Sequence, residues 1–204
     1  MELGRIYSAY SHASSRIVRG FTAHPTEFDT STCSDAHGLT REAALIQLQD
    51  RWNGFCRSLI LRSAVGGIRT LSGLNLVRAY SSEAAALQAL RGTFTGRDRK
   101  GANWEPKWFD PSEAIDAASR LVIPNYATVS AALGATPSPL EELRCVRNFF
   151  AHRGALAATT MRRVVGVGCT LDAHAYVVAP QLGGATRFET WALTMERQAR
   201  AAVV

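Results

Sequence analysis

The side chains that could do chemistry gather in one stretch, ELRCVRNFFAHRG, which ends at Gly154. On a helical wheel at 100° per residue, this stretch has an apolar face and a polar face. Cys145 falls on the apolar face, so we expect a small buried hydrophobe and not a nucleophile. The other apolar members are Leu143, Val146, Phe149 and Phe150. The polar face, an arc of about 140°, consists of Arg144, Arg147, Asn148, Ala151 and His152.

The polar face offers the two groups that metal-free cleavage of RNA requires. Asn148 and His152 are four residues apart and Arg147 lies on the flank of the same face, so their side chains can converge. An imidazole exchanges protons near neutral pH and can take the proton of a 2′-hydroxyl group. A guanidinium group binds phosphate oxygens and stabilises the charge that develops on phosphorus. Because His152 lies in the last helical turn, the helix dipole favours its protonated form, and an acid role is equally available.

The run from Arg147 to His152 resembles the Arg-x4-His signature of the HEPN superfamily. In that superfamily a polar residue commonly follows the arginine, as Asn148 does here, and the motif lies on a late helix of a helical domain. The resemblance covers residues 40–160. It implies a metal-independent endoribonuclease of the kind found in toxin–antitoxin, phage-abortive-infection and CRISPR antiviral defence systems.

The resemblance also implies how the site is built. Arg147 would bind and orient the scissile phosphate, His152 would be the general acid or base, and Asn148 would position either of them. The implied protein is a homodimer in which two copies of this helix face each other and form one composite site. It needs no cofactor and no metal ion, and an antitoxin or another defence-system protein is an expected partner.

Further side chains outside the signature are expected to contact RNA. Two arginines are chosen for their charge and their position on or beside the helix. The others lie in residues 93–110, which lack periodicity and are interpreted as an exposed loop where tryptophan stacks on bases and cations follow the phosphates. The alternative is that the tryptophans of this loop only fold it back onto the core. The expected contacts are Arg144, Arg153, Arg97, Arg99, Lys100 and Trp104.

The helix that carries the signature has well-marked ends. Ser138 is expected as its N-cap, Pro139 as its first helical residue and Glu141 as the partner in a capping box. Gly154 marks its end. The apolar stripe from Leu45 to Leu59 predicts a second helix. That second helix is expected over residues 40–65, and further helices are expected over residues 1–20, 82–92 and 111–133, the last of them broken at Pro124.

Beyond the signature helix, the valine-rich residues 161–179 predict two short strands. Gly183 and Gly184 separate them from a C-terminal helix over residues 186–202. The predicted fold class is therefore mainly α, a HEPN-like helical bundle with a small β-hairpin appendage before the C-terminal helix. The whole of residues 1–204 is expected to form a single domain.

Composition narrows the class of protein. Lys and Arg number 23 against 17 Asp and Glu, a net charge of +6, which favours polyanions such as RNA as partners. The cysteines form no C-x-x-C pair, and the chain has no apolar stretch typical of a membrane span or a signal peptide, so a reduced, cytoplasmic setting is expected. The spacing of His24, Cys33 and His37 fits no compact zinc pattern.

Two other interpretations stay open beside the endoribonuclease. One is a non-catalytic, HEPN-like module that uses the same helix face to hold nucleic acid, a nucleotide or a protein partner. The other is an antitoxin-like or effector-partner subunit whose function lies in assembly. The sequence indicates neither an RNA target nor a base preference.

Overall fold

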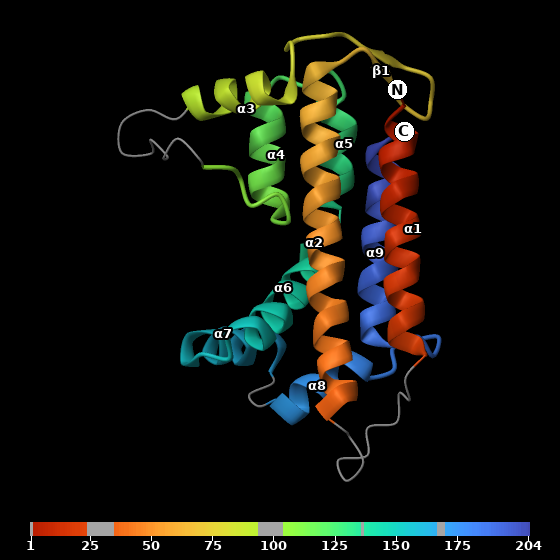
Figure 1. The fold of residues 1–204 in the computed structure, drawn as a ribbon, viewed down its shortest axis with the longest axis vertical. Coiled ribbons are helices and arrows are strands. Elements are labelled where there is room, and N and C mark those ends of the chain that lie inside the picture. Colours follow the sequence, from red (N-terminus) through yellow and green to blue (C-terminus); the bar gives the residue numbers. More distant parts are fainter. Residues whose placement is uncertain (1, 24–34, 94–103, 136, 167–169) are drawn as a thin grey trace. The chain divides into compact units, whose positions relative to one another are not determined.

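The structure is a computed structural model, which describes residues 2–23, 35–93, 104–135, 137–166 and 170–204 (Figure 1). Within these ranges the chain is mainly helical, as predicted, with one antiparallel pair of short strands in which Ile68 pairs with Leu76. The elements are α1 (Leu3–Thr22), α2 (Asp35–Val65), β1 (Ile68–Arg69), β2 (Asn75–Leu76), α3 (Glu83–Gly92), α4 (Pro111–Arg120), α5 (Tyr126–Gly134), α6 (Pro137–His152), α7 (Ala155–Val165), α8 (Thr170–Val178) and α9 (Arg187–Ala202).

The described residues group into two compact units. Unit 1 comprises Met1–Ser11, Trp52–Ala135 and Arg197–Val204. Unit 2 comprises His12–Arg51 and Thr136–Glu196, so it holds α6 and with it the predicted signature. Each unit contains buried apolar side chains of its own.

Several helices begin and end where the sequence predicts. Ser82 is the N-cap of α3, and its hydroxyl oxygen accepts a hydrogen bond from the backbone N–H of Ala85 at 3.2 Å. The break expected at Pro124 separates α4 from α5. The second helix begins at Asp35, earlier than the predicted Thr40. The polar residues before Thr40 therefore extend the helix, although their composition is more typical of a loop.

The predicted β-hairpin at residues 161–179 is wrong. The chain forms α7 and α8 across this range, and the paired strands are β1 and β2 instead. In α8 the buried side chains repeat with a helical spacing, which brings Val177 and Val178 onto the packed face. Burial on a helix face outweighs the preference of valine for strands. Gly166 ends α7 in a left-handed conformation with φ 75°.

In unit 2, aromatic packing joins α1 to α9. The ring of Phe21 stacks on that of Phe188, with 4.1 Å between the centroids, and the two helices lie side by side (Figure 1). The apolar faces of these helices are thus used for packing within the chain. In none of the described helices do length and apolar character reach what a membrane crossing requires.

In unit 1, the described end of the predicted loop packs onto the core. Trp108 is 2% exposed and donates its indole N–H to Glu105 at 3.0 Å. The carboxylate also accepts a hydrogen bond from Nε of Arg57 at 2.9 Å. The Arg57 contact, followed by that of the indole, holds the pKa of Glu105 below its usual value. Trp108 therefore folds this part of the chain back, as the alternative interpretation expects.

Variants of two neighbouring glycines can test the packing of the turn that follows α2. Gly66 and Gly67 have φ values of 71° and 67°. A Cβ atom on Gly66 would lie 2.2 Å from the carbonyl oxygen of Val77, whereas one on Gly67 would meet nothing within 4 Å. We expect Gly67→Ala to lower the free energy of unfolding by about 1–2 kcal/mol through backbone strain. Gly66→Ala should cost about 1–3 kcal/mol more because of the clash. Urea denaturation followed by circular dichroism measures both, and equal losses would contradict this packing.

Candidate functional site

α6 buries the apolar face that its sequence predicts. The five apolar members, Leu143, Cys145, Val146, Phe149 and Phe150, are each at most 6% exposed. Burial raises the pKa of the Cys145 thiol, which keeps it protonated and unreactive. Because this side is covered, the opposite side of α6 carries the polar residues outward.

The start of α6 differs from the prediction. The helix begins at Pro137, so Ser138 lies inside the first turn and is not the N-cap. Both Pro137 and Pro139 fit this turn, since its backbone N–H groups have no partner within the helix. Further along α6, the carboxylate of Glu142 accepts hydrogen bonds from the indole N–H of Trp191 at 3.2 Å and from Arg187 at 3.4 Å. These contacts tie α6 to α9.

Arg147 and Asn148 come together on the polar face. Nη1 of Arg147 donates to Oδ1 of Asn148 at 3.2 Å, and Nη2 lies 3.9 Å from Oδ1 of Asp50 on α2. The Asp50 side chain is 65% exposed, so this ion pair is weak. Nε of Arg147 is buried and has no hydrogen-bond partner in the described part of the chain. Because Nε is buried, an anion would have to bind Nη1 and Nη2, and the long contact of Nη2 with Asp50 is the one that it would replace.

His152 is the last residue of α6, and both it and Ala151 are exposed. Within the described ranges, neither a hydrogen bond nor an ion pair joins the His152 side chain to another residue. The structure thus brings Arg147, Asn148 and Asp50 together and leaves His152 apart from them in a single chain. An exposed imidazole at a helix C-terminus can exchange protons with water or with a bound substrate.

The chain turns sharply after α6 and is anchored there by an ion pair. Arg153 has a left-handed backbone with φ 45°. Its Nη2 lies 2.8 Å from each carboxylate oxygen of Glu42, a side chain on α2 that is only 11% exposed. Arg153 was expected to bind substrate, but its guanidinium group is engaged by Glu42. We assign this pair to fixing the end of α6 beside His152.

The same carboxylate contacts a buried histidine. Nε2 of His174, on α8, lies 3.3 Å from Oε1 of Glu42, and the imidazole packs on the ring of Phe150 with 4.7 Å between the centroids. Burial lowers the pKa of His174, and although Glu42 opposes this, the charges of Arg41 and Arg153 add to it. We therefore describe His174 as neutral in the folded protein near pH 7.

The remaining predicted contacts are distributed over both units. Nη2 of Arg144 lies 4.0 Å from Oε1 of Glu141, one turn earlier on α6. Trp104 is half-buried in unit 1, and its carbonyl oxygen accepts a hydrogen bond from Nε of Arg91 at 2.8 Å. The other three, Arg97, Arg99 and Lys100, lie outside the described residues.

Sequence reasoning missed Glu42, Asp50 and His174. Glu42 precedes the apolar stripe of α2 by three residues and so lies on its core-facing side, where a carboxylate needs a partner. That position is a signal that the sequence contains. His174 lies within a range predicted as strands, which hid its place on the packed face of α8. Asp50 has no comparable signal, because its contact with Arg147 depends on how α2 and α6 pack.

Among the described residues, no three His, Cys, Asp or Glu side chains gather as ligands for a metal ion. His24 and Cys33, considered above for zinc, lie outside these residues. No protein-family model matches the chain, and neither a curated protein nor a solved structure is significantly similar to it. The resemblance to the HEPN superfamily therefore depends on the residues of α6.

The anchor at the end of α6 can be tested through stability. Glu42→Gln removes the charge that holds Arg153 and His174, and we expect it to lower the free energy of unfolding by about 1–2 kcal/mol, reduced by the solvent exposure of Arg153. Glu141→Gln is the matched control, since that exposed carboxylate is 4.0 Å from its arginine. The control should change stability by less than about 0.5 kcal/mol. Equal urea midpoints for the two variants would argue against the anchor.

His174 makes stability depend on pH. Because its pKa is lowered on folding, the unfolded chain takes up a proton first as the pH falls below about 6.5. The free energy of unfolding should therefore rise with pH from that acidic range towards 7, and His174→Gln should flatten the rise. Urea denaturation across this range measures it, with His12→Gln, an exposed imidazole, as control. The lowered pKa of Glu105 also makes stability depend on pH, but in a more acidic range, at pH values below about 4.5, the ordinary pKa of the group. A slope unchanged by His174→Gln would refute the assignment.

Proposed function

We propose that this protein is a metal-independent endoribonuclease with a HEPN-like site on α6, acting in a prokaryotic defence or toxin–antitoxin system. One observation carries the proposal. The apolar side of α6 is buried, so the opposite side carries an exposed imidazole, that of His152, and the half-buried guanidinium group of Arg147, whose ion pair with Asp50 is long at 3.9 Å. A proton-transfer group and a phosphate-binding group are what this reaction needs.

The proposed reaction is an attack within the RNA strand. The neutral imidazole of His152 in one copy takes the proton of a 2′-hydroxyl group, and the 2′-oxygen bonds to the adjacent phosphorus. The bond from phosphorus to the 5′-oxygen breaks, and the protonated imidazole of the second copy gives its proton to that oxygen. The products carry a 2′,3′-cyclic phosphate and a 5′-hydroxyl group. Arg147 binds the non-bridging oxygens, and Asn148 orients its guanidinium group through the 3.2 Å hydrogen bond.

Two copies are part of the proposal because a single chain does not complete the site. Arg147 and His152 are separated by about 140° around the helix axis. A second copy of α6, facing the first, supplies the missing imidazole to each Arg147. Ala151 supports this arrangement, since it is small and exposed and lets another backbone approach.

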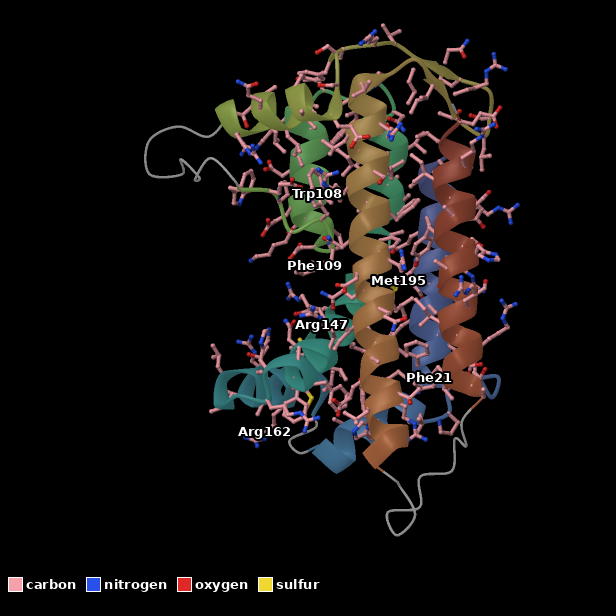
Figure 2. The ribbon with its side chains drawn as sticks, viewed as in Figure 1. Phe21, Trp108, Phe109, Arg147, Arg162 and Met195 are labelled. Atoms are coloured by element: carbon pink, nitrogen blue, oxygen red, sulfur yellow. The ribbon has the colours of Figure 1, made fainter. Side chains whose placement is uncertain are left out.

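A basic surface next to α6 fits a polyanionic substrate. α7 packs against α6, and Arg162, labelled in Figure 2, and Arg163 in its last turn are exposed. Arg144 on α6 adds a third guanidinium group that is partly exposed. Such a group of guanidinium groups attracts the phosphates of an RNA strand on either side of the cleaved bond.

A second candidate is a non-catalytic module that binds nucleic acid or a protein partner through the same face. The weak ion pair of Arg147 with Asp50 favours it, because the guanidinium group is drawn towards α2 and not towards His152. Binding of RNA without cleavage, lost in Arg147→Ala and kept in His152→Ala, would support this candidate over the nuclease.

Cleavage of RNA by the purified protein in EDTA tests the proposal. We expect His152→Ala to lower the cleavage rate by at least about 100-fold, because a general acid–base group is lost. Arg147→Ala should lower it by about 100-fold or more through the loss of charge stabilisation. Both variants should keep the circular dichroism spectrum of the parent, since the buried apolar face of α6 is unchanged. The melting temperature should stay the same for His152→Ala, whose side chain is exposed.

Matched controls come from α1, where His12 and Arg5 are exposed. His12→Ala and Arg5→Ala remove the same chemical groups from a different surface and should keep the parental rate. Full activity in the double variant of Arg147 and His152 would contradict the proposal, as would an equal loss in the two controls.

A further inference from the structure

A cleft on unit 2 lies between α1 and α2, away from the residues of α6. Its volume is about 370 Å³, and residues 13–21 of α1 and 40–51 of α2 line it. Every lining residue belongs to unit 2. The volume lies near the lower end of the range for small-molecule pockets, about 300–1,000 Å³. It has room for a molecule of mononucleotide size and not for a long chain.

Each of the two helices contributes one arginine to the cleft. Arg16 comes from α1 and Arg51 from α2, and both are exposed. In the part of the chain that the structure describes, neither guanidinium group has an ion-pair or hydrogen-bond partner. Two uncompensated cations on opposite walls of one cleft match a ligand group with close to two negative charges. A phosphate monoester carries about −1.5 to −2 at pH 7, whereas a carboxylate carries only one charge.

The rest of the cleft is suited to a flat, partly apolar group. The half-buried Ile17 gives it apolar surface, while Gly20 and Ala43 leave space, since a Cβ atom on Gly20 would meet nothing within 4 Å. The exposed amide of Gln47 supplies both a hydrogen-bond donor and an acceptor. An amide of this kind can pair with the edge of a nucleobase while the ring lies on the apolar surface.

We propose that this cleft binds a nucleoside monophosphate group, with its phosphate between Arg16 and Arg51 and its base over Ile17 beside Gln47. The group comes either as a free mononucleotide or as the phosphorylated end of an RNA strand. The proposal goes beyond the nuclease proposed for α6, because the cleft and α6 share no residue. Binding at the cleft and cleavage at α6 can therefore succeed or fail separately.

Isothermal titration of the purified full-length chain with AMP, GMP, CMP and UMP tests this site. We expect at least one of them to bind with a dissociation constant below about 1 mM, and the matching nucleoside without phosphate to bind about tenfold more weakly or worse. Arg16→Gln and Arg51→Gln should each weaken binding about tenfold. Ala43→Leu, which fills the cleft from an exposed position, should also weaken it.

Arg19→Gln is the control, because it removes an exposed arginine from α1 that does not line the cleft. It should leave binding unchanged, and the melting temperatures of all variants verify that they fold. The proposal is overturned if none of the four mononucleotides binds below 1 mM. It is also overturned if the Arg16 and Arg51 variants bind as the parent does, or if Arg19→Gln weakens binding equally.

A 5′-phosphorylated RNA oligonucleotide distinguishes the two sources of the ligand. This titration uses the His152→Ala variant, so that cleavage cannot consume the oligonucleotide. Tighter binding of the oligonucleotide than of the mononucleotide, lost in Arg51→Gln, assigns the cleft to RNA ends. Weaker binding assigns it to free mononucleotides. If neither Arg16→Gln nor Arg51→Gln weakens binding of the oligonucleotide, the cleft is not a site for RNA ends.

Discussion

The burial of Phe149 and Phe150 determines which way α6 faces. Both rings lie on the packed side of the helix, together with the three other apolar side chains of that face. A helix that buries two phenylalanines cannot rotate about its axis without exposing them, which costs several kcal/mol by the usual estimate of about 1.5–3 kcal/mol for each buried side chain. The outward position of Arg147 and His152 follows from this packing and not from any contact of their own.

Polar contacts fix what apolar packing leaves undetermined, namely the position of each end of α6. Glu142 receives hydrogen bonds from two residues of α9 near the helix start. Glu42 holds Arg153 just beyond the helix end and contacts His174. Glu42 is only 11% exposed, and a nearly buried carboxylate is costly when unpaired, so its contacts favour one arrangement of the helices; the contacts of Glu142, which is 27% exposed, add less. His152 lies between the packed body of α6 and the anchored turn.

Sequence patterns predicted the local features well. The two faces of α6 and the helix near residues 82–92 depend on residues within one or two helical turns, and the structure agrees with both. The prediction of strands over the valine-rich residues 161–179 was wrong because the strand preference of valine is weak compared with burial. The apolar pattern that marks α8 is also only about two turns long. The contacts of Glu42, Asp50 and His174 join residues far apart in sequence, so periodicity could not supply them. The cleft between α1 and α2 could not be predicted for the same reason, since it forms where residues of two helices face each other and neither helix alone has a distinctive sequence pattern.

The chemical identity of the RNA ends tests the central claim most directly. Purified protein is incubated with a labelled RNA in EDTA, and the new ends are identified by mass spectrometry. Attack by the 2′-oxygen, as proposed for the site on α6, predicts fragments with a 2′,3′-cyclic phosphate and a 5′-hydroxyl group. Fragments with a 5′-phosphate and a 3′-hydroxyl group, or intact RNA at every protein concentration, would contradict the account.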